Sequence, residues 1–134
     1  MPISFRFKEE KSPIFGKIHR PVAEVFFKEK LHNLWQPVTM IVDTGADYTL
    51  LPLFLAEELG VDVVKDCQTI MTQGVGGTGR VYLLKNKIEA RIGDLMRQIP
   101  IGFLDSDYIP PLLGRQEFFE TFKVVFEKFS VMFA

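Results

Sequence analysis

The feature that most constrains this chain is an apolar run that ends in a carboxylate and a glycine. Residues 40–42, Met-Ile-Val, lead directly into Asp43, Thr44 and Gly45. A carboxylate at the end of a buried strand has to be hydrogen-bonded or paired, because burying an unpaired charge is very costly. Gly45 permits a sharp turn and the close approach of another segment. Ordinary turns also use Asp, Thr and Gly, so the tripeptide alone fits both a plain turn and a reactive site.

Most of the chain shows the alternation or the short apolar runs that are typical of β-strands. These patterns predict strands over residues 1–11, 22–27, 38–42, 49–51, within 61–71, and over 80–84, 88–92, 98–104 and a terminal hairpin over 123–133. Short helices are predicted over 52–60, with Pro52 in the first turn and Gly60 after the end, and over 116–122. The sequence therefore predicts an all-β protein with one or two short helices, in a single domain over residues 1–134.

Composition narrows the function classes. The chain has 134 residues, of which 47% are hydrophobic and 25% charged, with a formal net charge of −1. Such a balance gives no global attraction to nucleic acid or to a membrane, and no apolar run is long enough to span a bilayer. The single Cys67 excludes an internal disulfide and a multi-cysteine metal site. We expect no metal and no cofactor, and a cytoplasmic location, since the N-terminus lacks the apolar run of a signal peptide.

Two other motifs permit a second interpretation. Asp105 and Asp107 could contribute to a metal site, but no third ligand stands at a fixed spacing, which favours a solvated turn. Residues 74–79 match G-x-G-x-x-G, the fingerprint of dinucleotide-binding loops. That fingerprint requires a following helix, whereas the β-rich segment 80–84 follows here. A hairpin with a glycine-rich tip is the better interpretation, and a loop without a role is its alternative.

Three segments resemble, in the right order, those of the retropepsin-like aspartic proteases. They are the active-site loop Ile41-Val42-Asp43-Thr44-Gly45-Ala46, the glycine hairpin at 73–79, which resembles the flap, and Leu112-Leu113-Gly114-Arg115. Together they span roughly residues 38–122. In that family the arginine of the last segment pairs with the acidic residue four positions after the catalytic aspartate. The resemblance therefore implies a structural ion pair between Asp47 and Arg115. The helix at 52–60 and Tyr48 depart from many viral members, so substrate preference does not transfer.

The resemblance implies a closed acid-protease barrel that assembles as a twofold homodimer. The implied catalytic residues are Asp43, Thr44 and Gly45, and the implied substrate-binding residues are Ala46, Asp47, Tyr48, Val75, Gly76 and Gly77. Side-chain pockets would be lined by Tyr48, Leu50, Val75 and Val81. Pepsin-type chains carry two Asp-Thr-Gly segments, but this chain carries one, so the second carboxylate has to come from another copy.

The expected function is aspartic endopeptidase activity on a polypeptide substrate, with no nucleic-acid or membrane partner. The alternative is a catalytically weak module that keeps the fold and binds peptides or dimerises, because a fold alone does not establish an activity.

Overall fold

A computed structural model describes residues 2–74 and 77–134 of the protein. The strands are β1 (Ile3–Arg6), β2 (Lys8–Ser12), β3 (Gly16–Arg20), β4 (Val22–Lys28), β5 (Trp35–Val42), β6 (Thr49–Pro52), β7 (Cys67–Gly74), β8 (Gly77–Leu84), β9 (Ile88–Ile92), β10 (Leu95–Ile99), β11 (Ile101–Leu104), β12 (Leu112–Leu113), β13 (Val124–Glu127) and β14 (Ser130–Phe133). A short helix α1 (Phe54–Glu58) and a 3-10 helix η1 (Phe119–Thr121) complete the elements. The all-β prediction is confirmed. No helix in the described ranges is long and apolar enough to cross a bilayer.

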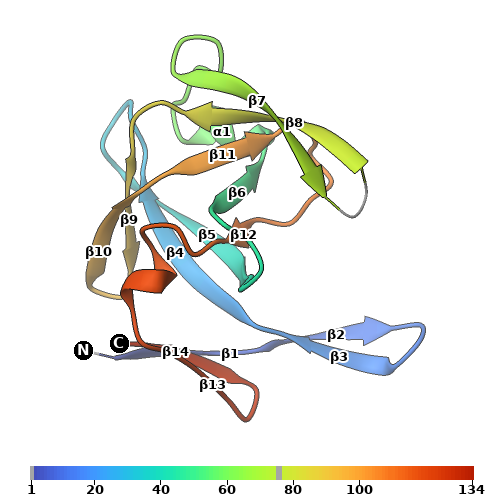
Figure 1. Ribbon diagram of the computed structural model, residues 1–134. Coiled ribbons are helices and arrows are strands. Elements are labelled where there is room, and N and C mark those ends of the chain that lie inside the picture. The colour runs from blue at the N-terminus through green and yellow to red at the C-terminus, as the bar shows by residue number, and fades with distance from the viewer. Residues whose placement is uncertain (1, 75–76) are drawn as a thin grey trace.

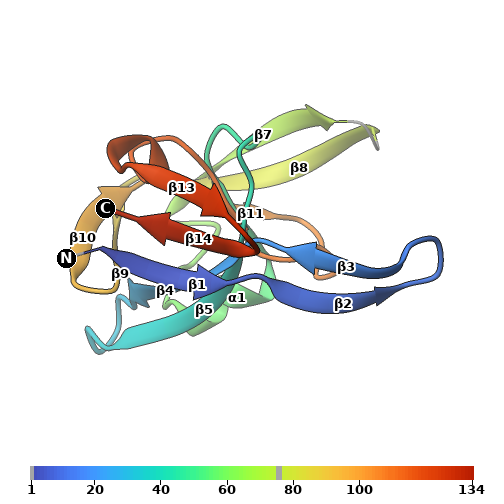
Figure 2. The same cartoon turned by 90° about the horizontal axis from the view of Figure 1, so that it is seen from below.

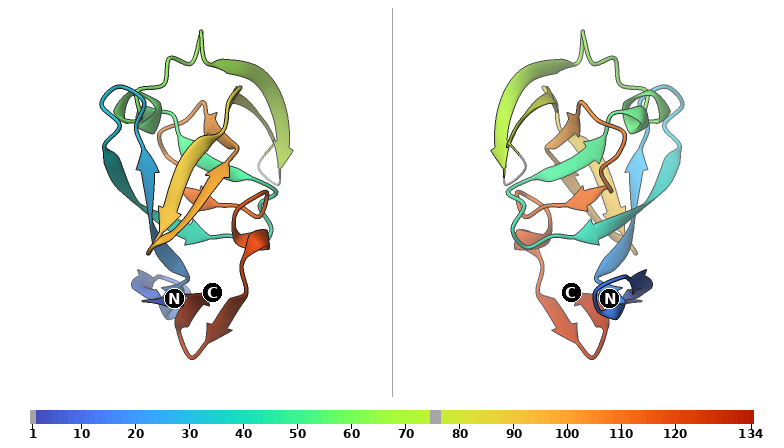
Figure 3. Two further views of the ribbon diagram at one scale, coloured as in Figure 1. Left: turned by 90° about the vertical axis from the view of Figure 1, so that its left-hand side faces the viewer. Right: turned by 90° about the vertical axis from the view of Figure 1, so that its right-hand side faces the viewer.

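Nine strands form the main sheet, in the order β10-β9-β4-β5-β12-β6-β11-β8-β7, and this sheet curls around the core (Figures 1 and 3). Most neighbours are antiparallel. Two pairs are parallel: β12 runs alongside β5, and β11 runs alongside β6. Since parallel neighbours require long connections, these pairs bring together parts of the chain that are far apart in sequence.

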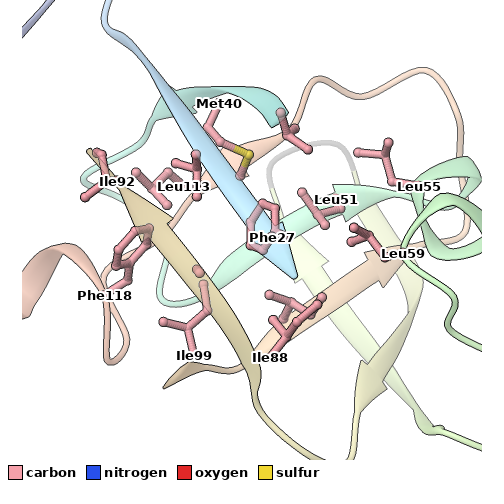
Figure 4. Packing of buried hydrophobic residues seen from close by; sticks show 14 of the residues in the cluster. Phe27, Met40, Leu51, Leu55, Leu59, Ile88, Ile92, Ile99, Leu113 and Phe118 are labelled. Carbon is pink, nitrogen blue, oxygen red and sulfur yellow. The ribbon is translucent and has the colours of Figure 1, made fainter. Parts of the chain in front are cut away.

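The core lies inside the curled sheet and is almost entirely apolar (Figure 4). On β4, Ala23, Val25 and Phe27 are fully buried, while Glu24 between them is exposed, as the period of two in a strand requires. From other strands Met40, Leu51, Phe103 and Leu113 are also fully buried, and Phe118 covers one end. The loop that begins at Asp43 therefore follows a strand, β5, whose inner face is firmly packed.

Two smaller sheets lie beside the main sheet, and β14 of one of them contributes the fully buried Val131 and Phe133 to the core. The order β1-β14-β13 defines the first of these, which we call the terminal sheet because it joins both ends of the chain. The second consists of β2 and β3 alone and projects from the body as a ribbon (Figures 1 and 2).

Several predicted boundaries are wrong. The strand predicted over 1–11 is two strands, because β1 pairs with β14 whereas β2 pairs with β3. The strand predicted over 98–104 is also divided, at Pro100, which has no N–H to donate to a ladder. Helix α1 is shorter than predicted, and Pro52 ends β6 instead of starting the helix. Gly60 does follow the helix with a φ of 70°, but the helix predicted over 116–122 is only the 3-10 helix η1.

The turn between β4 and β5 is built around a buried carboxylate. Glu29 accepts hydrogen bonds from the backbone N–H groups of Leu31 (2.9 Å), His32 (2.6 Å) and Leu34 (3.1 Å). Burial raises the pKa of Glu29, but these three donors outweigh burial, and the net result is a pKa below the ordinary 4.5. The ionised carboxylate is thus part of the folded turn.

Glu29→Gln is therefore expected to destabilise the fold in a pH-dependent way. A folded-state pKa below the unfolded one stabilises the protein above about pH 4.5, and this contribution disappears as the pH falls through the folded value. The melting temperature of the variant should be several degrees below that of the native chain at pH 7, and the difference should narrow at pH 3. Circular dichroism melts measure both, with the exposed Glu24→Gln as control. If the melting temperature of the variant is lower by the same amount at pH 7 and at pH 3, the ionised carboxylate does not have this role.

Candidate functional site

The loop of residues 43–48 joins β5 to β6 and holds Asp43 at its start. The backbone N–H of Asp43 donates to the carbonyl of Leu113 in β12 (3.1 Å), and its carbonyl accepts from Ala46 (3.2 Å). The N–H of Gly45 donates to Oδ1 of the Asp43 carboxylate (3.0 Å), the only hydrogen bond that the described residues give this carboxylate. Asp43 is half-buried, whereas Thr44 and Gly45 are exposed. The carboxylate is thus fixed in place and still open to a reactant.

Gly114, the residue directly after β12, packs tightly against the loop. A Cβ atom on Gly114 would lie only 2.1 Å from the carbonyl carbon of Tyr48, so no larger residue fits without moving the backbone. The N–H of Gly114 donates to the hydroxyl of Thr49, which is completely buried (3.2 Å). Thr49 is not among the site residues predicted from the sequence, although a threonine at the start of an apolar strand was the available signal.

The residues after Gly114 hydrogen-bond to the second half of the loop, at Ala46 and Asp47. The N–H of Arg115 donates to the carbonyl of Ala46 (3.1 Å), and the N–H of Gln116 donates to the carbonyl of Asp47 (2.8 Å). The guanidinium of Arg115 also pairs with the carboxylate of Asp47, with 2.5 Å between Nη2 and Oδ1. The structure therefore brings these two residues together across 68 positions of sequence, as an ion pair supported by backbone hydrogen bonds.

Arg115→Ala is expected to cost little stability. The side chain of Asp47 is 83% exposed and that of Arg115 is 45% exposed, and exposed ion pairs contribute at most about 1 kcal/mol. The two backbone hydrogen bonds remain in the variant. Urea unfolding of native and variant chains should therefore differ by less than about 1 kcal/mol. Arg115→Lys, which keeps the charge, is the control. A decrease in the free energy of unfolding of Arg115→Ala well beyond that limit would contradict a minor role of the ion pair in stability.

Tyr48 covers a glycine at the edge of the loop. A Cβ on Gly102 would lie 2.9 Å from Cε2 of Tyr48 and 2.7 Å from Cγ1 of Val81, so the tyrosine ring needs this glycine in β11. Burial, followed by the charge of Asp47, raises the pKa of Tyr48, and the phenol stays neutral. Leu50 is half-buried nearby, but Val81 is completely buried. Val81 therefore does not line an open pocket, and that part of the expected pocket is wrong.

The glycine-rich segment forms a hairpin, as predicted. Strands β7 and β8 pair with Gln73 opposite Thr78 and Gly74 opposite Gly77. The expected substrate-binding residues Val75 and Gly76 lie outside the described residues, while Gly77 begins β8. Because a strand follows the glycines, the dinucleotide-binding interpretation is wrong.

The remaining polar candidates have local roles. Asp107 accepts a hydrogen bond from the N–H of Phe54 at the start of α1 (2.9 Å), and Asp105 pairs with Arg80 (3.7 Å). Within residues 2–74 and 77–134, no group of three or more His, Cys, Asp or Glu side chains could hold a metal ion. The described surface has one hollow of about 520 Å³ beside α1 and another of about 260 Å³ between β4 and β9, and neither includes Asp43.

Comparison with known proteins agrees with this geometry. A family model described as aspartyl protease matches residues 30–116, and no curated protein matches the chain. The crystal structure of a retropepsin-like aspartic protease from Rickettsia conorii has a TM-score of 0.68 at 20% identity, covering 98% of each chain. The EIAV protease complexed with the inhibitor HBY-793 has a TM-score of 0.53 at 19% identity, covering 72% of this chain and 82% of that one. The predicted retropepsin-like fold is thereby confirmed.

Proposed function

This chain belongs to the aspartyl protease family, and from that premise we propose that it is an aspartic endopeptidase that acts as a homodimer. The observation that carries the proposal is the way in which Asp43 is held. Its backbone is tied to β12, one carboxylate oxygen is tied to Gly45, and the adjoining Thr44 and Gly45 are exposed. A fixed carboxylate beside an exposed loop edge is suited to meeting a second carboxylate.

The proposed chemistry needs two carboxyl groups and one water molecule. One ionised carboxylate takes a proton from the water as the oxygen attacks the peptide carbonyl, and the protonated partner donates to the developing oxyanion. Two carboxyl groups that share one proton titrate in two separated steps, which keeps this mixed state populated. Since this chain supplies only Asp43, a twofold-related copy supplies the second carboxylate.

The surrounding residues would position the substrate. The exposed hydroxyl of Thr44 would hydrogen-bond to the partner's loop across the twofold axis and hold the two carboxyl groups together. Asp47, with Ala46 and Tyr48 beside it, would contact an extended peptide from below. The hairpin of β7 and β8 would cover that peptide and pair with it as an added strand, and Val75, Gly76 and Gly77 are the residues of this segment that we expect to bind the substrate. Leu50 and the ring of Tyr48, both half-buried, would provide apolar contact for its side chains.

The test is cleavage of an unfolded protein by the purified chain between about pH 4 and 7, where a carboxyl pair that shares one proton can work. The activity per mole of chain should rise with chain concentration and level off well above the dimer dissociation constant. A statine-type transition-state analogue should block cleavage. Cleavage that the analogue does not inhibit would refute the proposal. Peptide binding by a dimer without cleavage would favour the weakly active binding module.

A further inference from the structure

The two-stranded ribbon formed by β2 and β3, here called the arm, lacks a surface of its own to pack on. Five residue pairs join its strands, from Lys8–Arg20 to Ser12–Gly16, and no third strand of the described chain extends it. Figures 1 and 2 show it projecting well beyond the body. An isolated two-stranded ribbon is at best marginally stable in water, so the arm is suited to packing against another molecule.

The tip of the arm is apolar and well defined. Ile14 is 80% exposed and Phe15 is 76% exposed. The hydroxyl of Ser12 accepts hydrogen bonds from the N–H groups of both residues (3.3 and 3.1 Å), which fixes the turn. Two adjacent large apolar side chains presented on a built turn are typical of an interaction site.

Both carboxylates of the arm are paired within it. Glu9 lies 3.3 Å from Lys17, and Glu10 lies 2.8 Å from Arg20 on the opposite strand. Because opposite charges already meet across the ribbon, they do not require a charged partner. The exposed apolar side chains of the arm are those of its tip, Ile14 and Phe15, and an apolar surface is the partner that they fit.

The base of the arm fixes its direction. The N–H of Phe7 donates to the carbonyl of Phe129 (2.8 Å), and the ring of His19 stacks on the ring of Phe129 with centroids 4.2 Å apart. Phe129 has a φ of 64°, which is unusual for a bulky residue, and is still 59% exposed. Phe126 next to it is 44% exposed. The arm thus starts from an aromatic cluster that retains accessible apolar surface.

The direction of the arm points to a second copy of this chain. In Figure 1 the arm, the β5–β6 loop, the end of β7 and the start of β8 lie toward the same side of the body. The proposed function, on which this inference rests, requires the second copy on that side. Figure 2 shows that the arm and the terminal sheet both lie on the lower side of the molecule in the view of Figure 1. With a twofold axis beside the β5–β6 loop, each arm would therefore run along the lower side of the other copy.

We propose that each arm crosses to the second copy and packs Ile14 and Phe15 on that copy's terminal sheet, against the exposed aromatic surface of the partner subunit's Phe126 and the partner subunit's Phe129. The arm would then be a dimerisation element that helps to bring two Asp43 loops together. Being isologous, the contact occurs twice in each dimer, so the loss of one tip removes both contacts.

The test compares dimer dissociation constants, measured by sedimentation velocity over a concentration series. The double variant Ile14→Ser/Phe15→Ser should raise the constant at least about tenfold, since fully burying one such side chain contributes enough for that factor. The matched control Val64→Ser/Met96→Ser removes two exposed apolar side chains elsewhere and should leave the constant unchanged. A constant for the arm variant equal to that of the native chain, or a native chain that stays monomeric, would overturn the proposal.

Two further measurements separate this proposal from the proposed function. A photoreactive residue at position 15 should cross-link to residues 123–134 of the second copy, and a cross-link to substrate or to another region would overturn the docking site. Asp43→Asn should dimerise as the native chain does. If Asp43→Asn still cleaves while the arm variant fails to dimerise, the proposed catalytic role of Asp43 is refuted and the role of the arm in dimerisation is supported. If the arm variant dimerises and cleaves as the native chain does, the role of the arm is refuted and the proposed function is not affected.

Discussion

Asp43→Asn should abolish peptide cleavage and leave the fold intact. The amide cannot accept a proton from water or share one with a second carboxylate, so we expect a loss of at least about a thousandfold in kcat/KM. Its oxygen can still accept the hydrogen bond from the N–H of Gly45 that holds the loop (3.0 Å). Cleavage of an unfolded protein measures the first effect, and thermal unfolding measures the second.

The control for this substitution is Asp94→Asn, because Asp94 is an exposed carboxylate in the turn between β9 and β10. It should keep full activity. Mixing equal amounts of native and Asp43→Asn chains tests the shared pair directly. Random pairing leaves about one quarter of the dimers with two native loops, so the activity should fall toward that share of the all-native rate. Activity that simply halves would show that each chain works alone.

The parts of the site that the sequence predicts are those encoded in contiguous residues. An apolar run followed by Asp43, Thr44 and Gly45 can be recognised because the strand and its turn are adjacent in the chain. The glycine hairpin at 73–79 follows for the same reason, since strand-forming residues stand on both sides of it. The pairing of Asp47 with Arg115 was expected only from the resemblance, because nothing local links two charges that lie 68 positions apart.

What the sequence does not predict depends on non-local pairing. Strand β12 has only two residues, too few for any periodicity, and its place between β5 and β6 emerges only in the fold. The alternation over residues 1–11 runs unbroken through Phe7, yet β1 and β2 join different sheets because their partners differ. The burial of Val81 likewise depends on Gly102 in another strand. Partner choice, rather than local propensity, decides these features.

The largest stability effect is expected from Gly114→Ala. A Cβ at this position would lie 2.1 Å from the carbonyl carbon and 2.3 Å from the carbonyl oxygen of Tyr48, both of them backbone atoms that no rotamer change can move. Either β12 or the 43–48 loop has to shift. A shift would strain the hydrogen bond from Gly114 to the buried Thr49 and that from Asp43 to Leu113. We expect the free energy of unfolding to fall by about 4 kcal/mol or more, a loss that only severe core disruptions cause.

Gly79→Ala is the matched control for this prediction. A Cβ there meets the end of the Leu104 side chain at 3.3 Å and Thr72 at 3.8 Å, and a flexible leucine can move by the small distance required. Its free energy of unfolding should stay within about 1 kcal/mol of the native value. Urea unfolding measures both variants, and a failure of Gly114→Ala to yield folded chain under conditions that yield Gly79→Ala is the same result in stronger form. If Gly114→Ala is as stable as Gly79→Ala, the close packing of Gly114 against the loop of residues 43–48 is not what holds Asp43 in place.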